Sequence, residues 1–269
     1  MRLKAMCDMT LTAEEDCPTV AMLRPSSGVA QWLASEAYYF DPPVKSTEYV
    51  DVFGNLCQRF IVPKGRMRIR VDVVVDAERA IAVDPDAPQT PVDEVPDAAL
   101  QYLLQSRYCP SDKMEGRARQ VVAGVAPGYA QVEAIRAWIH DNLAYRYGVS
   151  DAATDALDTL SAGAGVCRDF AHVGIGLCRA LQVPARMVVG YLHQLDPMDL
   201  HAWFEAFVGG RWYTFDATQD TPRGGRIVVA YGRDAADVAF LSNYGPLTTE
   251  KLTVQVALHA DDVPAQLGD

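Results

Sequence analysis

The sequence lacks a long apolar run of the kind that crosses a membrane. A spanning helix needs about 18 or more consecutive apolar residues, and no segment of this chain reaches that length. Residues 1–17 also contain no apolar core of signal-peptide length, so no export signal is recognised there. We therefore expect a soluble protein that stays in the cytoplasm.

Positive charge is scarce. The chain has 24 Lys and Arg against 35 Asp and Glu, which gives a formal net charge of −11. Proteins that bind nucleic acids or anionic membrane surfaces depend on clustered Lys and Arg, and no such cluster is present. The charge balance therefore argues against both kinds of partner. With 269 residues, 49% of them hydrophobic, the chain has enough apolar residues for the core of one large domain or two smaller ones.

The cysteines show no metal-binding or disulfide pattern. No Cys-x-x-Cys pair or Cys/His cluster has the spacing of a structural zinc site. Disulfide frameworks are typical of short secreted chains, and this chain is long and has no recognised export signal. We therefore expect no zinc and no disulfides, but five structural thiols and one reactive thiol among positions 7, 17, 57, 109, 167 and 178.

The sequence of residues 1–85 predicts a small antiparallel β-sandwich. The segment 67–73 alternates apolar and polar residues, as a half-buried strand does. Two further β-prone runs flank the turn-forming pair Gly54-Asn55, which predicts a hairpin. We expect these strands to pair with an earlier one, over residues such as 3–11.

A linker rich in proline and acidic residues marks a change of composition. It is placed at 86–110 and separates the β-sandwich from a second domain at 111–269. In that domain predicted helices precede predicted strands without regular alternation, so we assign the α+β class. The helices are expected at 129–145 and 167–181, and the strands at 187–191, 202–208, 211–215 and 253–258.

Cys167 differs from the other cysteines because it follows a glycine-rich turn at the start of a predicted helix. The positive end of a helix dipole favours a thiolate there, and the thiolate is the nucleophilic form of cysteine. Cys178 lies in the middle of the same helix and has neither advantage. The sequence therefore indicates Cys167 as the reactive thiol.

His201 and Asp216 lie on two strands that the Gly-Gly pair at 209–210 predicts to be a hairpin. Pairing about that turn places His201 opposite position 218, with Asp216 two residues away on the same face. An imidazole oriented by a carboxylate is the usual general base for a nucleophilic side chain. Together with Cys167, these residues predict a Cys-His-Asp triad in chain order.

The segments around these three residues resemble the core motifs of the transglutaminase-like superfamily. They are G-x-G-x-C-R-D-F-A-H around Cys167, D-x-H-A-W-F-E around His201 and W-x-x-F-D-A-T around Asp216. The β-rich region before them also resembles the N-terminal domain of bacterial members. The resemblance implies a papain-like fold preceded by a small antiparallel β-sandwich. It also implies Cys167 as nucleophile, His201 as general base and Asp216 as its orienting carboxylate.

The resemblance further implies a thiol-dependent acyl-transfer enzyme that acts on peptide or carboxamide bonds through a thioester. Because the superfamily includes transglutaminases, peptidases, amidases and deglycosylating enzymes, the motifs do not fix the natural substrate. We favour a hydrolase of the peptidase or amidase kind, with a peptide or protein substrate and no cofactor. Two alternatives stay open: a protein-glutamine transglutaminase that forms isopeptide bonds, and a binding module with a vestigial triad. The sequence also leaves the oligomeric state open.

An upstream aromatic side chain is expected to supply the second oxyanion donor, beside the backbone N–H of Cys167. Trp138 lies on the apolar stripe of its predicted helix, where packing in the core is the better interpretation. Tyr145 lies just past that stripe. Tyr145 is therefore the preferred candidate.

Asp169 and His172 follow Cys167 on the same predicted helix. His172 is five residues further on, roughly 140° round a helix of about 3.6 residues per turn, so it should pack or support the site rather than face it. Asp169 either shapes the cleft or forms an internal ion pair, and the sequence supports both. No metal is expected, since Cys167, His201 and Asp216 lack the close spacing of a metal site.

Overall fold

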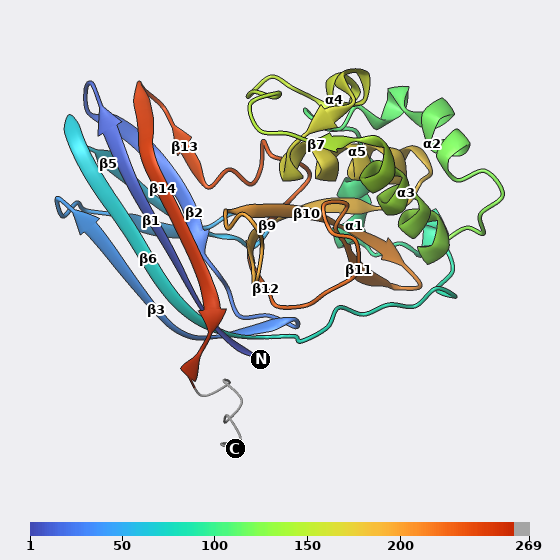
Figure 1. The fold of residues 1–269 in the computed structure, drawn as a ribbon, viewed down its shortest axis with the longest axis horizontal. Helices are drawn as coiled ribbons and strands as arrows, with labels where there is room; N and C mark the ends of the chain where they lie inside the picture. The colour runs from blue at the N-terminus through green and yellow to red at the C-terminus, as the bar shows by residue number, and fades with distance from the viewer. Residues whose placement is uncertain (261–269) are drawn as a thin grey trace, which may run out of the picture.

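Two four-stranded antiparallel sheets form the N-terminal half of the molecule (Figure 1). The computed structural model describes residues 1–260. The first sheet has the strand order β14-β1-β6-β3 and the second has the order β13-β2-β5-β4. Their bounds are β1 Arg2–Ala13, β2 Cys17–Arg24, β3 Gln31–Asp41, β4 Thr47–Val50, β5 Leu56–Val62, β6 Gly65–Ala77, β13 Leu241–Asn243 and β14 Leu247–Leu258.

Alternating side chains explain why these segments form sheets. Along β6, Met67, Ile69 and Val71 are buried, while the arginines between them are exposed or half-buried. This alternation confirms the strand predicted at 67–73. β6 pairs with β1, and β4 pairs with β5 across the predicted hairpin, so both expected pairings are present.

The C-terminal strands belong to the N-terminal sheets, which differs from the expected domain boundary. The range 111–269 included the strand predicted at 253–258, but β14 pairs with β1 along nearly its whole length. β13 likewise pairs with β2 in the second sheet. β1 would otherwise present an unpaired edge, and the returning strand covers it. Residues 261–269 of that range lie outside the described residues.

Residues 86–110, expected to be a linker, contain short helices that pack on the rest of the molecule. They are the 3-10 helices η1 Val92–Glu94 and η2 Gln101–Leu103 and the single-turn helix α1 Asp97–Leu100. Tyr102 is buried, and its ring makes an edge contact at 5.4 Å with Trp212. This proline-rich segment is therefore a packed connection between the two halves.

The α+β half, residues 111–232, places helices against one antiparallel sheet of order β11-β10-β9-β12 (Figure 1). Its elements are η3 Ser111–Lys113, α2 Glu115–Val121, α3 Tyr129–Asn142, β7 Ala144–Tyr145, α4 Ala156–Ala162, β8 Ala164–Gly165, α5 Cys167–Ala180, β9 Ala185–Leu192, β10 His201–Val208, β11 Arg211–Phe215 and β12 Arg226–Gly232. These elements confirm the predicted α+β class. No helix within residues 1–260 is long and apolar enough to cross a membrane.

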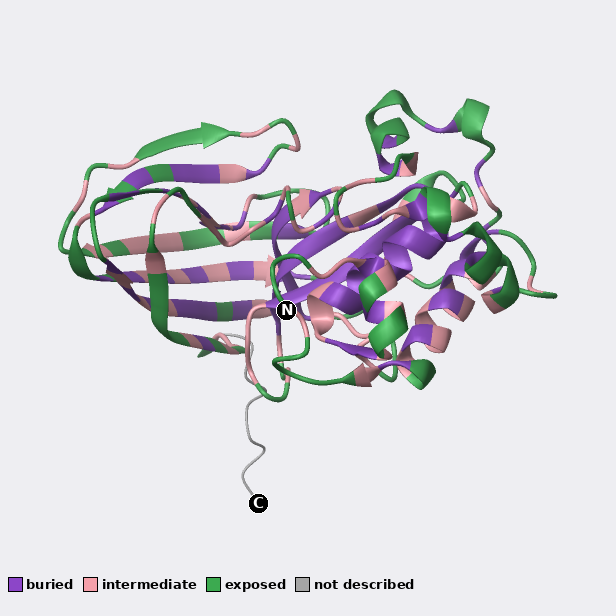
Figure 2. Cartoon of the chain, turned by 90° about the horizontal axis from the view of Figure 1, so that it is seen from above, coloured by how far each residue is buried: buried purple, intermediate pink, exposed green. Residues whose placement is uncertain are grey.

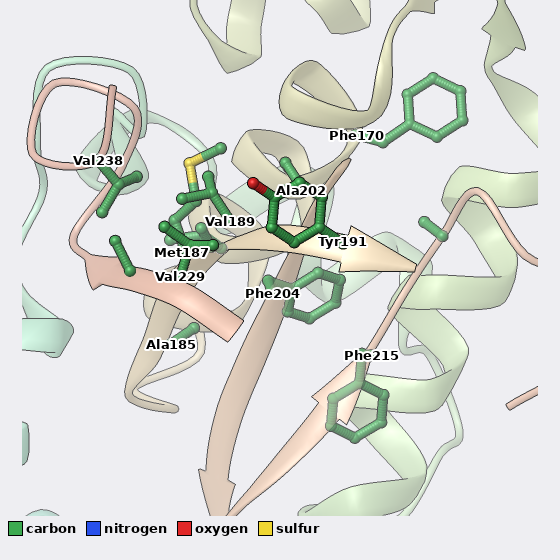
Figure 3. Packing of buried hydrophobic residues seen from close by; sticks show 14 of the residues in the cluster. Phe170, Ala185, Met187, Val189, Tyr191, Ala202, Phe204, Phe215, Val229 and Val238 are labelled. Atoms are coloured by element: carbon green, nitrogen blue, oxygen red, sulfur yellow. The ribbon is translucent and has the colours of Figure 1, made fainter. Parts of the chain in front are cut away.

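The core of this half lies between α5 and β10. Every residue of β10 is buried, as is α5 from Asp169 to Arg179 (Figure 2). Figure 3 shows Phe204 of β10 and the other apolar side chains that fill this layer. Gly174 allows the helix to approach the strand, because a Cβ there would lie 2.5 Å from the Phe204 ring. This close packing fixes the start of α5 relative to the start of β10.

We expect Gly174→Ala to destabilise the protein by about 2 kcal/mol. The Phe204 ring that an added Cβ would meet stacks on Phe215 and has little room to move. Urea unfolding measures the change. Gly116→Ala is the matched control: this glycine also lies in a helix, but an added Cβ would meet no atom within 4 Å. Its free energy of unfolding should stay level or rise by up to about 1 kcal/mol. Equal loss in both variants would contradict the packing argument.

Candidate active site

Cys167 is the first residue of α5 and is half-exposed, whereas the other five cysteines are buried. The Asp169 carboxylate accepts a hydrogen bond of 2.9 Å from the Val166 N–H, and its other oxygen pairs with Arg168 at 3.0 Å. Asp169 itself is fully buried. Of the two roles that the sequence left open for Asp169, the ion pair is therefore present, and the carboxylate also fixes the turn that presents Cys167.

The glycines before Cys167 have separate roles. Gly163 ends α4 with a φ of +65°, a left-handed conformation that glycine adopts readily. A Cβ at Gly165 would lie 2.7 Å from the Cβ of Asp169, so only glycine fits there. Gly165 also pairs with Tyr145 across the short parallel strands β7 and β8. The glycine-rich turn thus brings Tyr145 to the start of α5.

His201 is the first residue of β10, and its Nε2 atom lies 2.8 Å from Oδ2 of Asp216. The hairpin has the predicted register, with Phe204 opposite Phe215. The ladder ends at that pair, so position 218 is unpaired and Asp216 reaches the imidazole directly. Both side chains are nearly inaccessible to solvent, at 2% for His201 and 3% for Asp216.

Cys167 lies close enough to His201 to affect the pKa of its imidazole. Burial by itself lowers the pKa of His201, but the charge and hydrogen bond of Asp216, with a contribution from Cys167, raise it to about 9. Burial raises the pKa of Asp216, but the charges of His201 and Arg226 outweigh it and hold the pKa far below its usual range. The imidazole is therefore protonated beside a carboxylate at neutral pH, which is the arrangement that stabilises a thiolate partner.

Arg226 is a site residue that sequence reasoning missed. It is the first residue of β12, and its Nη1 atom lies 2.9 Å from Oδ2 of Asp216 in an ion pair whose side chains are 6% and 3% exposed. Oδ1 of Asp216 accepts hydrogen bonds from the backbone N–H and hydroxyl of Thr218, at 3.0 and 2.7 Å. The sequence could have indicated Thr218, because it is part of the third motif. Arg226 lies ten residues beyond Asp216 and only the sheet brings it back.

Tyr145 lies beside the proposed nucleophile. It pairs with Gly165, two residues before Cys167, and burial raises the pKa of its phenol. The ring is 42% exposed and makes edge contacts with Phe170 at 5.8 Å and with Tyr147 at 5.6 Å. Tyr145 is therefore a partly exposed side chain next to the start of α5.

Trp138 and His172 have other surroundings. Trp138 on α3 packs against the core, with the Arg117 guanidinium 5.6 Å from its ring centre. His172 is fully buried, stacks on Tyr108 at 5.0 Å, and accepts a hydrogen bond from the Ala235 N–H. Burial lowers the pKa of His172 to about 3, so it is neutral and packs as a structural residue. Within residues 1–260 no group of three or more His, Cys, Asp and Glu side chains is arranged to hold a metal ion.

The raised pKa of His201 predicts a loss of stability in mild alkali. The protonated imidazole stabilises the folded state fully below its ordinary pKa of about 6.5, and this contribution is lost as the pH rises through the folded pKa of about 9. We expect the free energy of unfolding to fall between these values, as measured by urea titration at pH 6, 7.5 and 9. The His201→Gln variant should lack that part of the decline. If the free energy of unfolding depended on pH in the same way in the wild type and in the variant, the raised pKa of His201 would be contradicted.

Comparison with known proteins places these residues in a family. The family model described as the Transglutaminase-like superfamily matches residues 115–217, a segment that contains Cys167, His201 and Asp216. A Cytophaga hutchinsonii chain, whose crystal structure is described as that of a "Putative Cysteine Protease", is 34% identical. The alignment covers 96% of this chain and 90% of that one, with a TM-score of 0.90.

Two mycobacterial proteins are similar over most of their lengths. An uncharacterized protein of Mycobacterium leprae is 28% identical over 81% of this chain and 83% of its own length. An uncharacterized protein of Mycobacterium tuberculosis is 27% identical over 90% of this chain and 85% of its own length. The near full-length match to the Cytophaga chain, together with the family model over the three motifs, shows that this protein belongs to the transglutaminase-like superfamily.

Proposed function

We propose that this protein hydrolyses peptide or carboxamide bonds by acyl transfer to Cys167. The single observation that carries the proposal is the buried His201–Asp216 pair, which holds the imidazole against the half-exposed thiol at the start of α5. Membership of the superfamily and the likeness to a protein described as a cysteine protease support a thiol-dependent enzyme. The geometry of the site supports the roles of the three residues, and the substrate class is what the resemblance to the superfamily implies.

The proposed reaction has two stages. In the first, the Cys167 thiolate adds to the carbonyl carbon, and the tetrahedral intermediate collapses as His201 donates its proton to the leaving amine. The product of this stage is a thioester on Cys167. In the second, the neutral imidazole takes a proton from water, and the resulting hydroxide attacks the thioester. Collapse releases the carboxylic acid and restores the thiolate–imidazolium pair.

The same thioester has an alternative fate. A primary amine in place of water would give a new amide, which is the isopeptide reaction of a transglutaminase. Both fates use the same three residues, so the two hypotheses differ in the product and not in the nucleophile. The test of function must therefore identify the nucleophile and the product separately.

We expect Tyr145→Phe to lower kcat by about 10²-fold with little change in KM. In the proposed reaction the Tyr145 hydroxyl and the Cys167 N–H both donate to the oxyanion, so the lost bond acts mainly in the transition state. Turnover of p-nitrophenyl acetate, an activated ester that acylates reactive thiolates, measures the effect. Tyr244→Phe is the control, since its side chain is 72% exposed and directly follows β13, and it should stay within about threefold of wild type. An equal loss in both variants would argue against a specific role for Tyr145.

Selective alkylation tests the nucleophile. Iodoacetamide near pH 6 should label Cys167 and leave the five buried cysteines unmodified, as read by peptide mass. Burial raises the pKa of Cys7 to about 12, so that thiol is inert at this pH. Uniformly unreactive cysteines would contradict the proposal and favour a binding module with a vestigial triad.

The product distinguishes hydrolysis from transfer. A glutamine-containing peptide is incubated with the enzyme, with and without a primary amine, and the products are weighed. Release of the acid in both samples supports a hydrolase, whereas an amine adduct in the second sample supports the transglutaminase. The Cys167→Ala protein is the control in both arms, and activity in that protein would overturn the mechanism.

A further inference from the structure

One oxygen atom of Asp216 contacts two cationic side chains. Oδ2 lies 2.8 Å from Nε2 of His201 and 2.9 Å from Nη1 of Arg226, while Oδ1 is occupied by Thr218. A carboxylate that orients a base by itself would direct its whole charge at the imidazole. Here a second, permanent positive charge lies on the same oxygen.

The surroundings of Arg226 direct its charge at Asp216. Its guanidinium carbon lies 4.9 Å from the ring centre of Trp203, and that ring lies 5.9 Å from the His201 ring. Its Nε atom donates to the backbone carbonyl of Arg223. Among the described residues its terminal nitrogens make no contact with hydrogen-bond geometry, so the 2.9 Å contact of Nη1 with Asp216 is an ion pair. Asp216 is the carboxylate with which the structure pairs this buried cation. A desolvated guanidinium requires such an anion, so Arg226 keeps Asp216 ionised.

Other charged groups lie near this centre, and most of them are paired. Glu205 from β10 is paired with Arg186 at 2.6 Å, and Glu133 and Arg136 from α3 are paired with each other at 2.7 Å. The remaining groups are Cys167 from α5, Glu78 after β6 and Arg223 from the loop before β12. Glu205 lines the same small cavity as Arg226, but its charge is offset by Arg186. The electrostatic environment of His201 therefore depends mainly on Asp216 and on Arg226, which contacts the same Asp216 oxygen.

We propose that Arg226 is a positioning residue that holds the Asp216 carboxylate in place and offsets part of its charge, thereby setting the pH at which His201 gives up its proton. This inference rests on the proposed function of Cys167 and His201. Without Arg226 the imidazole would face an uncompensated carboxylate and would hold its proton more tightly. Arg226 thus allows His201 to cycle between acid and base within each turnover.

The test is the pH dependence of Cys167 alkylation by iodoacetamide in the full chain, from pH 5 to 11. In the wild type we expect a step near pH 9 as His201 loses its proton beside the thiolate. Arg226→Gln and Arg226→Met remove the charge and should raise the midpoint of this step by roughly one pH unit. Arg226→Lys keeps the charge and should stay within about 0.3 pH unit of the wild type. Arg223→Gln is the matched control for loss of a nearby cation and should stay equally close.

The outcomes separate the proposed function from the proposed role of Arg226. If Cys167 is not labelled selectively in the wild type, the proposed function fails. If Cys167 is labelled but the midpoint of Arg226→Gln is unchanged, falls, or moves no more than that of Arg223→Gln, the role of Arg226 is overturned and the function stands. Circular dichroism establishes that each variant is folded. If neither neutral variant folds, Arg226→Lys decides, because a shift of one unit in that variant contradicts the role of the charge.

Discussion

Cys167→Ala should reduce kcat by at least about 10⁴-fold, because Cys167 carries the acyl group in the proposed reaction. The proposed mechanism forms a covalent bond to this sulfur, and alanine would leave only substrate binding and the proposed oxyanion donors. Turnover of p-nitrophenyl acetate and of the amide peptide, each followed to completion, measures the loss. The fold should be unaffected, since Cys167 is half-exposed at the first position of α5.

Cys178→Ala is the control for this prediction. Cys178 lies in the same helix, but it is fully buried and faces the core. Its removal should leave kcat within about twofold of the wild type and lower stability by about 1 kcal/mol at most. If Cys167→Ala instead lost much less than about 10⁴-fold of its kcat, another nucleophile would carry the reaction.

Asp216→Asn should lower kcat by about 10³- to 10⁴-fold and the free energy of unfolding by about 3 kcal/mol. The amide removes the negative charge that both His201 and Arg226 require, and all three side chains are at most 6% exposed. His201 would then be neutral at pH 7, so no imidazolium would stabilise the thiolate or protonate the leaving amine. Kinetics and urea unfolding of one preparation measure the two effects together.

Asp220→Asn is the matched control, four residues further along the same loop. Asp220 lies 3.0 Å from His140, but its side chain is 89% exposed, so water replaces the lost contact. We expect stability within about 0.5 kcal/mol of the wild type and normal turnover. If Asp216→Asn kept its turnover and stability as Asp220→Asn is expected to do, His201 and Arg226 would not depend on the charge of Asp216.

The strands and the triad register were accessible from the sequence because both depend on local patterns. The two-residue period at 67–73 predicted β6, and the Gly-Gly pair at 209–210 predicted the register of β10 with β11. A hairpin relates residues close in sequence, so its pairing follows from the turn. For that reason the turn residues were enough to predict that His201 and Asp216 meet.

The domain boundary and the surroundings of Asp216 were not accessible in this way. β14 pairs with β1 across more than 230 residues of chain, as in Leu3 opposite Leu258, and no local pattern specifies that partner. Arg226 reaches Asp216 only because β12 lies beside β9 at the far edge of the sheet from β11. Its sequence neighbours carry no motif that marks it as a partner of the triad.

The sequence by itself determined the α+β class, the helix that begins at Cys167 and the hairpin that joins His201 to Asp216. These depend on periodicity, on turn residues and on motifs, which act over a few neighbouring positions. Only the tertiary structure decided that Tyr145 pairs with Gly165 beside Cys167, that His172 is a neutral structural residue and that Arg226 shares the Asp216 oxygen. These properties depend on burial and on contacts between distant segments, because charges and donors become strong only where the packed fold excludes water.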